Sequence, residues 1–173
     1  MADLLVTEST QRYAGYGLFL DRACKALAVL AGIMLTLMAF MSLWSIGGRT
    51  LFDKALVGDY ELVQFMTAVA VAMSLPYANW IGGHVIVDFF TAKAPVRTNA
   101  ALDTLAYGVM AAFSFLLTWR LSLGMVDLKG NFDASMLLSI PTWWGYVPLV
   151  PSFFLLGLTA LYQVHANLRK LRT

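Results

Sequence analysis

Charged residues are scarce in this chain. Only 13% of its 173 residues are Asp, Glu, Lys or Arg, whereas 60% are hydrophobic. Soluble domains contain about 25% charged and about 45–50% apolar residues. A soluble protein of this length has too little interior to bury so much apolar surface. The composition therefore predicts an integral membrane protein.

Cysteine and histidine are also rare. The single cysteine, Cys24, excludes an internal disulfide and a cysteine-based metal site. A haem within the subunit needs paired ligands at similar depth, and His84 and His165 both fall at helix ends.

Phosphate-binding, HExxH and serine-elbow motifs are missing. We predict no enzyme activity, cofactor or metal. A net charge of +2 without a basic patch predicts no nucleic-acid partner.

Long uncharged runs dominate the rest of the chain. A run of about 20 residues is enough to cross a bilayer as a helix. Three runs cover residues 26–48, 62–83 and 134–164, and a fourth, 104–126, is interrupted only by Arg120. We predict an all-α fold, one membrane domain over residues 1–173, with four membrane-spanning helices at about 26–49, 59–80, 97–127 and 141–164. Three prolines near the start of the last helix, Pro141, Pro148 and Pro151, predict a kink or loosening there.

Two short amphipathic segments lie outside these runs. Residues 12–27 place apolar and basic side chains on different sides of a helix, which fits an interfacial helix or an extension of the first span. Residues 84–92 follow a pair of glycines and place His84 one turn from Asp88. We expect a short interfacial helix there, with His84 marking the membrane edge. Metal binding or proton transfer by His84 is the alternative.

The distribution of basic residues predicts the orientation. Eight Lys and Arg residues lie in the N-terminal segment, in the loop between the second and third predicted helices and in the C-terminal segment. Three lie in the other two loops. Because cytoplasmic loops are enriched in these residues, both termini are predicted to be cytoplasmic. Trp143 and Trp144 then lie at the outer interface, where aromatic side chains anchor helices.

Arg120 is the one charge that interrupts an apolar run of a predicted span away from its ends. An arginine at a span centre costs about 2.5–3.5 kcal/mol on an insertion scale, and less near an interface. Arg120 either extends to the interface or pairs with Glu61 or Asp127. Arg49 and Glu61 also face each other across the first outer loop. We expect Arg49, Glu61 and Arg120 to fix helix register or to meet another protein.

Several motifs then resemble those of a known family. These are an arginine-ended first helix (SIGGRTLFDK), GDYEL, GGHVIVDFF, and SIPTWWGYVPLVPSFFLLGL. Together they are similar to the small membrane subunit, or Q subunit, of tripartite ATP-independent periplasmic (TRAP) transporters. The resemblance extends from about Arg49 to Gly157.

The resemblance implies a non-catalytic subunit in the bacterial inner membrane. Its partners would be a large membrane (M) subunit, a periplasmic substrate-binding protein on the outer face, and membrane lipid. Transport would be sodium-driven uptake of an organic acid with a carboxylate, such as a C4-dicarboxylate or sialic acid. The small subunit would act as a scaffold for the large elevator-type subunit.

Two other functions are compatible with a small membrane protein of four helices. A membrane anchor of a respiratory redox complex would need haem or quinone ligands, which the sequence does not offer. A self-sufficient small transporter would need a carboxylate in mid-span, but Glu61 and Asp103 lie at helix ends.

Overall fold

The computed structural model describes residues 16–52, 58–82 and 96–172. These residues form four helices: α2 (Tyr16–Phe52), α3 (Asp59–Trp80), α5 (Val96–Gly130) and α6 (Trp143–Arg172). Each is long and apolar enough to cross a membrane. The prediction of an all-α protein with four membrane-spanning helices is therefore confirmed. The segment 84–92, with His84 and Asp88, lies outside the described residues.

Helices suit these segments because every backbone group inside lipid must find its partner within the protein. The hydroxyl groups within α5 follow the same rule. Ser114, Thr118 and Ser122 each donate to the carbonyl oxygen four residues earlier, over 2.7–2.8 Å. The hydroxyl groups of these three side chains therefore form their hydrogen bonds within the helix, and none of the three is left unpaired in an apolar environment.

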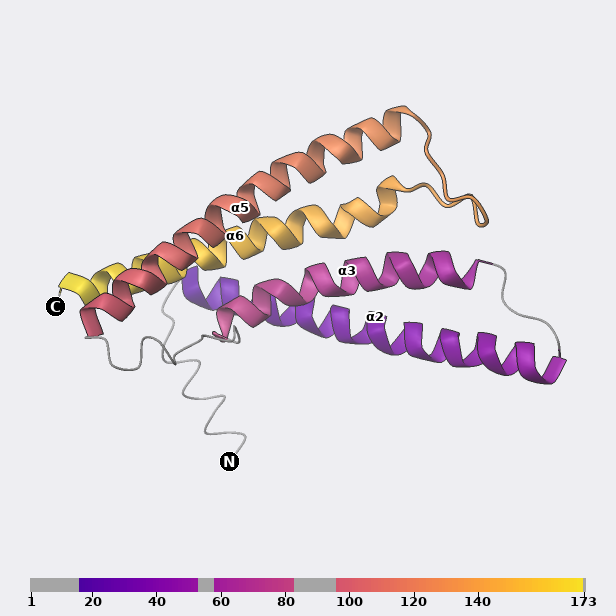
Figure 1. Ribbon diagram of the computed structural model, residues 1–173, viewed down its shortest axis with the longest axis horizontal. Helices are drawn as coiled ribbons and strands as arrows, with labels where there is room; N and C mark the ends of the chain where they lie inside the picture. Colours follow the sequence, from indigo (N-terminus) through magenta and orange to yellow (C-terminus); the bar gives the residue numbers. More distant parts are fainter. Residues whose placement is uncertain (1–15, 53–57, 83–95, 173) are drawn as a thin grey trace.

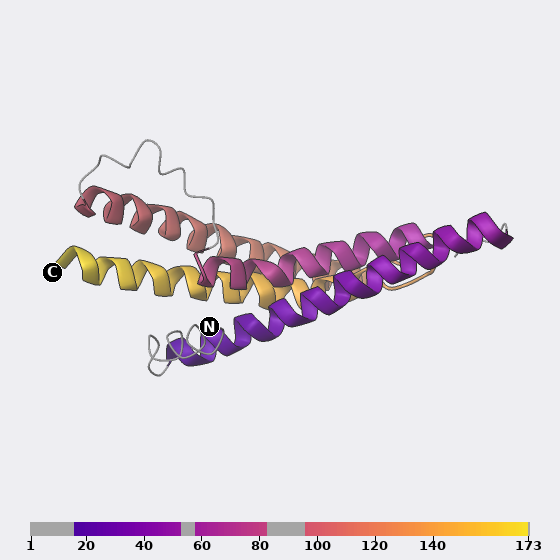
Figure 2. The ribbon, with the colours of Figure 1, turned by 90° about the horizontal axis from the view of Figure 1, so that it is seen from below.

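The helices form two hairpins. α2 packs on α3, α5 packs on α6, and the α3–α6 contact joins the two pairs. Figure 1 shows the hairpins meeting where α2 begins and α3 ends, beside α6, which continues past this point together with the start of α5; the hairpins diverge toward the loops between α2 and α3 and between α5 and α6. Figure 2 shows the length of α2 in the perpendicular view. We call the end with the start of α2 and the end of α6 the terminal end, and the opposite end the loop end.

Small residues allow close packing between the helices. Ala31 of α2 packs with Val69, Ala70 and Met73 of α3 in one buried cluster. Cys24, Trp80 and Leu155 form a second buried cluster nearer the terminal end. A Cβ atom added at Gly157 of α6 would lie 2.9 Å from the ring of Phe115.

The boundaries of two helices, α2 and α6, differ from the predicted ones. The described part of the N-terminal amphipathic segment, from Tyr16, is a continuous extension of α2. Of the two alternatives for that segment, the structure shows the extension. α6 begins at Trp143 and continues through Pro148 and Pro151. Pro141 lies before the helix, in a bridge with Ala134 that closes the α5–α6 loop.

Candidate functional site

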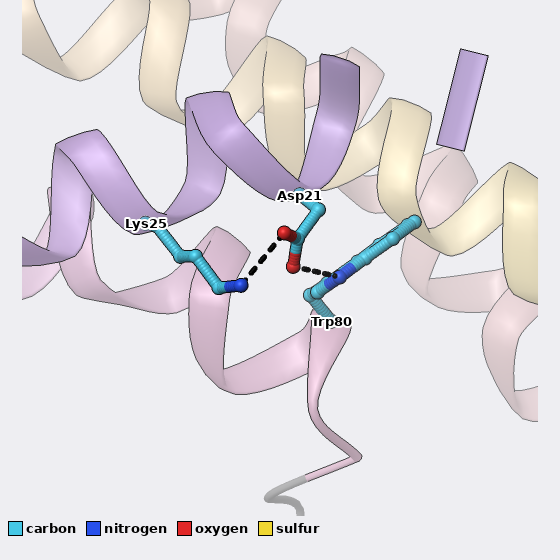
Figure 3. Close-up of polar contacts among 3 residues, drawn as sticks. All are labelled: Asp21, Lys25 and Trp80. Carbon is cyan, nitrogen blue, oxygen red and sulfur yellow. Dashed lines mark hydrogen bonds and ion pairs between the residues drawn. The ribbon is translucent and has the colours of Figure 1, made fainter. Parts of the chain in front are cut away.

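A buried carboxylate connects α2 to α3 at the terminal end. Asp21 is only 9% exposed. Its Oδ1 accepts a hydrogen bond from the indole N–H of Trp80 at 2.9 Å, and its Oδ2 pairs with the ammonium of Lys25 at 2.7 Å (Figure 3). A buried charge is tolerated when it is paired and hydrogen-bonded, and removing one partner is strongly destabilising. This Asp21–Trp80–Lys25 cluster therefore fixes how α2 and α3 meet.

The same end of α3 is also connected to α6. The side-chain amide of Asn79 donates to Oγ1 of Thr159 at 2.9 Å, and both side chains are fully buried. The ring of Trp80 lies 5.2 Å from that of Tyr162, measured between centroids. Gln163 donates to the Trp80 carbonyl oxygen at 3.5 Å. Neighbouring residues of α3 thus hold three helices together.

Glu61 performs a similar role at the loop end. Its carboxylate accepts hydrogen bonds from the hydroxyl of Ser135, from the N–H of Leu137 at 3.1 Å and from the N–H of Leu138 at 3.2 Å. Glu61 lies in the first turn of α3, where the helix dipole also favours a negative charge. The carboxylate therefore binds the α5–α6 loop to the start of α3, across the gap between the hairpins.

Gly58 makes room for this contact. Its φ of +81° lies in the left-handed region, which residues with a Cβ rarely adopt. The side chain of Leu138 occupies the place where a Cβ of Gly58 would lie. The loop can therefore approach α3 only because residue 58 is a glycine.

Another polar contact joins α2 to α3 at the loop end. The buried hydroxyl of Ser45 donates to Oδ2 of Asp59 at 2.6 Å, and the N–H of Tyr60 donates to Oδ1 at 2.7 Å. The α2–α3 hairpin is thus held by side-chain hydrogen bonds near both of its ends.

The predicted aromatic anchors lie at the start of α6. Trp143 and Trp144 are 6.1 Å apart with an interplanar angle of 76°, and Trp144 is 61% exposed. The ammonium of Lys129 lies 5.4 Å from the centroid of the Trp143 ring. An ammonium over an indole face is a favourable contact, and both groups are typical of a membrane–water interface.

Neither Arg49 nor Arg120 forms an ion pair among the described side chains. The one ion pair there joins Asp21 and Lys25. Arg49 and Arg120 are exposed, and the Glu61 carboxylate binds the α5–α6 loop. Asp127 is exposed as well.

Sequence reasoning missed the main contacts of the terminal end. No role was predicted for Asp21, and residue 80 entered only as the end of the second predicted helix. A signal was available, because Asn79 is a polar residue beside a tryptophan in an uncharged run. Polar groups inside a membrane usually face a partner within the bundle. The hydroxyl of Ser135 had no comparable signal, because serine is ordinary in a loop.

The arrangement is suited to holding helices in place. Within the described part of the chain, no three His, Cys, Asp or Glu side chains come together as a metal site would require. Each polar cluster joins one element to another, and large apolar side chains face outward along the helices. Four such helices define a multi-pass membrane protein.

Comparison with known families narrows this class. The family model described as "Tripartite ATP-independent periplasmic transporters, DctQ component" matches residues 38–170, which is most of the chain. The chain therefore belongs to the DctQ family of TRAP transporter components. No curated protein sequence matches it.

Membership of this family confirms the resemblance found in the sequence. The protein is a small, non-catalytic component of a TRAP transporter. The family implies association with a large M subunit and a substrate-binding protein. The redox-anchor alternative is left without support.

Proposed function

We propose that this chain is the small permease subunit of a sodium-driven secondary transporter in the bacterial inner membrane. It would act as a scaffold for the large elevator-type subunit during uptake of an organic acid with a carboxylate, such as a C4-dicarboxylate or sialic acid. The proposal rests on membership of the DctQ family.

One structural observation supports the scaffold role in particular. The helices are connected at both ends of the bundle by polar contacts, at Asp21 and at Glu61. Between these ends, large apolar side chains are exposed along α2 and α5. Fixed helices with an apolar exterior suit a protein that stays still while a partner moves against it.

The orientation and the anchors belong to the same proposal. With both termini cytoplasmic, the loop held by Glu61 faces the periplasm, where the binding protein docks. Trp143 and Trp144 anchor α6 at the outer interface, and Arg49 lies at the same end of α2. His84 and Asp88 would set the cytoplasmic connection between α3 and α5.

Reconstitution tests the proposal. The small and large subunits are placed together in proteoliposomes, the binding protein is added outside, and uptake of labelled succinate and sialic acid is measured under an inward sodium gradient. We expect uptake of one acid that requires both membrane subunits and stops when the gradient is dissipated. Equal uptake without the small subunit would contradict the scaffold role, and uptake that ignores sodium would contradict the coupling.

A further inference from the structure

One face of α5 carries a regular stripe of exposed side chains. They follow one another at intervals of three or four residues: Val109, Phe113, Leu116, Arg120 and Leu123. The buried residues Ala111 and Ser114 lie on the other side of the helix, and α5 packs mainly on α6. The stripe therefore faces away from the rest of the chain. We call it the Arg120 stripe.

The spacing suits contact with another helix. Side chains that alternate at intervals of three and four residues pack into the grooves of a neighbouring helix in left-handed bundles. Lipid tails could also cover four of the five side chains, because these are apolar. Arg120 is the exception, so its charge decides what covers the stripe.

Arg120 needs an anion that the described side chains do not provide. Among them the one ion pair is at Asp21. Lys129, which lies over the Trp143 ring near the membrane interface, follows Arg120 by nine residues. At 1.5 Å per residue, Arg120 is roughly 13 Å deeper along the helix. A charge at such depth is costly and is usually paired.

The direction of the side chain makes the nearer headgroups a poor partner. Side chains of an α-helix lean toward its N-terminus. The N-terminus of α5 is at the terminal end, so the Cα–Cβ bond of Arg120 is tilted away from Lys129 and toward the middle of the membrane. Extending to the nearer lipid phosphates works against this lean. An anion held within the membrane by another protein avoids the problem.

We propose that the Arg120 stripe is the surface on which the large M subunit packs, and that a carboxylate of that subunit pairs with Arg120. This inference rests on the proposed function and adds the location and chemistry of the contact. A guanidinium and a carboxylate form two parallel hydrogen bonds, which also fix the register of the two helices.

Charge variants test the pair in the intact transporter. The chain is co-expressed with its large subunit and binding protein, and the large subunit retained on the tagged small subunit is measured in mild detergent. We expect Arg120→Leu to lower retention at least about ten-fold, because it leaves a buried carboxylate unpaired. Arg120→Lys keeps the charge and should lose less. Arg22→Leu removes an exposed arginine of α2 and should leave retention unchanged.

Photo-crosslinking tests the surface independently of any loss of stability. A photoreactive residue replaces Leu116 or Leu123 on the stripe, or Phe40 on an exposed face of α2. We expect Leu116 and Leu123 to cross-link to a membrane segment of the large subunit that contains Asp or Glu.

Other results would overturn the inference in distinct ways. Cross-links from Phe40 alone would place the large subunit on α2 and leave the proposed function intact. An intact Arg120→Leu complex that has lost a bound phospholipid in native mass spectrometry would identify a lipid phosphate as the anion. Failure of the unmodified chain to retain the large subunit would contradict the proposed function itself.

Discussion

The indole of Trp80 lies where three helices meet. It donates to Asp21 of α2, packs against Tyr162 of α6 and belongs to α3 itself. Single side chains such as this one determine the packing, because apolar helices in lipid lack the hydrophobic driving force that operates in water.

Replacing Trp80 by Phe should destabilise the fold. The ring remains, but the donor to the buried Asp21 carboxylate is lost. Hydrogen bonds to charged groups contribute about 1.5–3 kcal/mol, and we expect the free energy of unfolding to fall by about that amount. Unfolding in mixed micelles, followed by circular dichroism, measures it. Trp144→Phe alters an exposed ring and serves as the control; equal stability of the two variants would contradict the prediction.

A pair of glycines offers a second comparison at the residue scale. In Gly157→Ala the new Cβ would lie 2.9 Å from the Phe115 ring, which must move and disturb its edge contact with Phe154. We expect a loss of about 1–3 kcal/mol from overpacking. Gly32→Ala meets nothing within 4 Å and should be neutral or stabilising, since alanine favours helices. The same unfolding measurement applies, and a stable Gly157→Ala variant would refute the close packing of α5 on α6.

At the scale of the elements, the position of the α5–α6 loop depends on its hydrogen bonds to Glu61. Glu61→Gln keeps the size of the side chain but removes its charge and one acceptor oxygen. Hydrogen exchange of the Leu137 and Leu138 amides should then quicken by about ten-fold or more, since bonds to a charged acceptor are among the stronger ones. Mass spectrometry of the peptide covering residues 135–140 measures this. Asp127→Asn removes an exposed carboxylate at the same end and should leave the exchange rate unchanged.

The four helices were predictable because uncharged runs of sufficient length have few other structures available in a membrane. The contacts between helices were not. Asp21 and Trp80 are 59 residues apart and Asn79 and Thr159 are 80 apart, so pairing depends on helix packing that no local pattern encodes. Glu61 was recognised as important, but the partners considered for it were arginines. The acceptor oxygens were instead satisfied by a loop whose backbone amides have no sequence signature.

For the whole molecule, the predicted orientation can be tested with single cysteines. The native Cys24 is buried and should react little with a membrane-impermeant maleimide. Phe132→Cys, at a 90% exposed position in the α5–α6 loop, should be labelled in cells whose outer membrane alone has been permeabilised. His165→Cys, near the end of α6, should be labelled only after the inner membrane is opened. The reverse pattern would place the termini outside.

The length of α2 links this protein to the thickness of its bilayer. The uncharged residues 26–48 of α2 measure about 35 Å as a helix, against about 30 Å for a typical hydrocarbon core. Such a helix tilts to bury its excess length. Because α2 is bound to α3 near both ends, the hairpin tilts as one body. Longer acyl chains would bring the hairpin more upright, so transport in reconstituted vesicles should vary with lipid chain length.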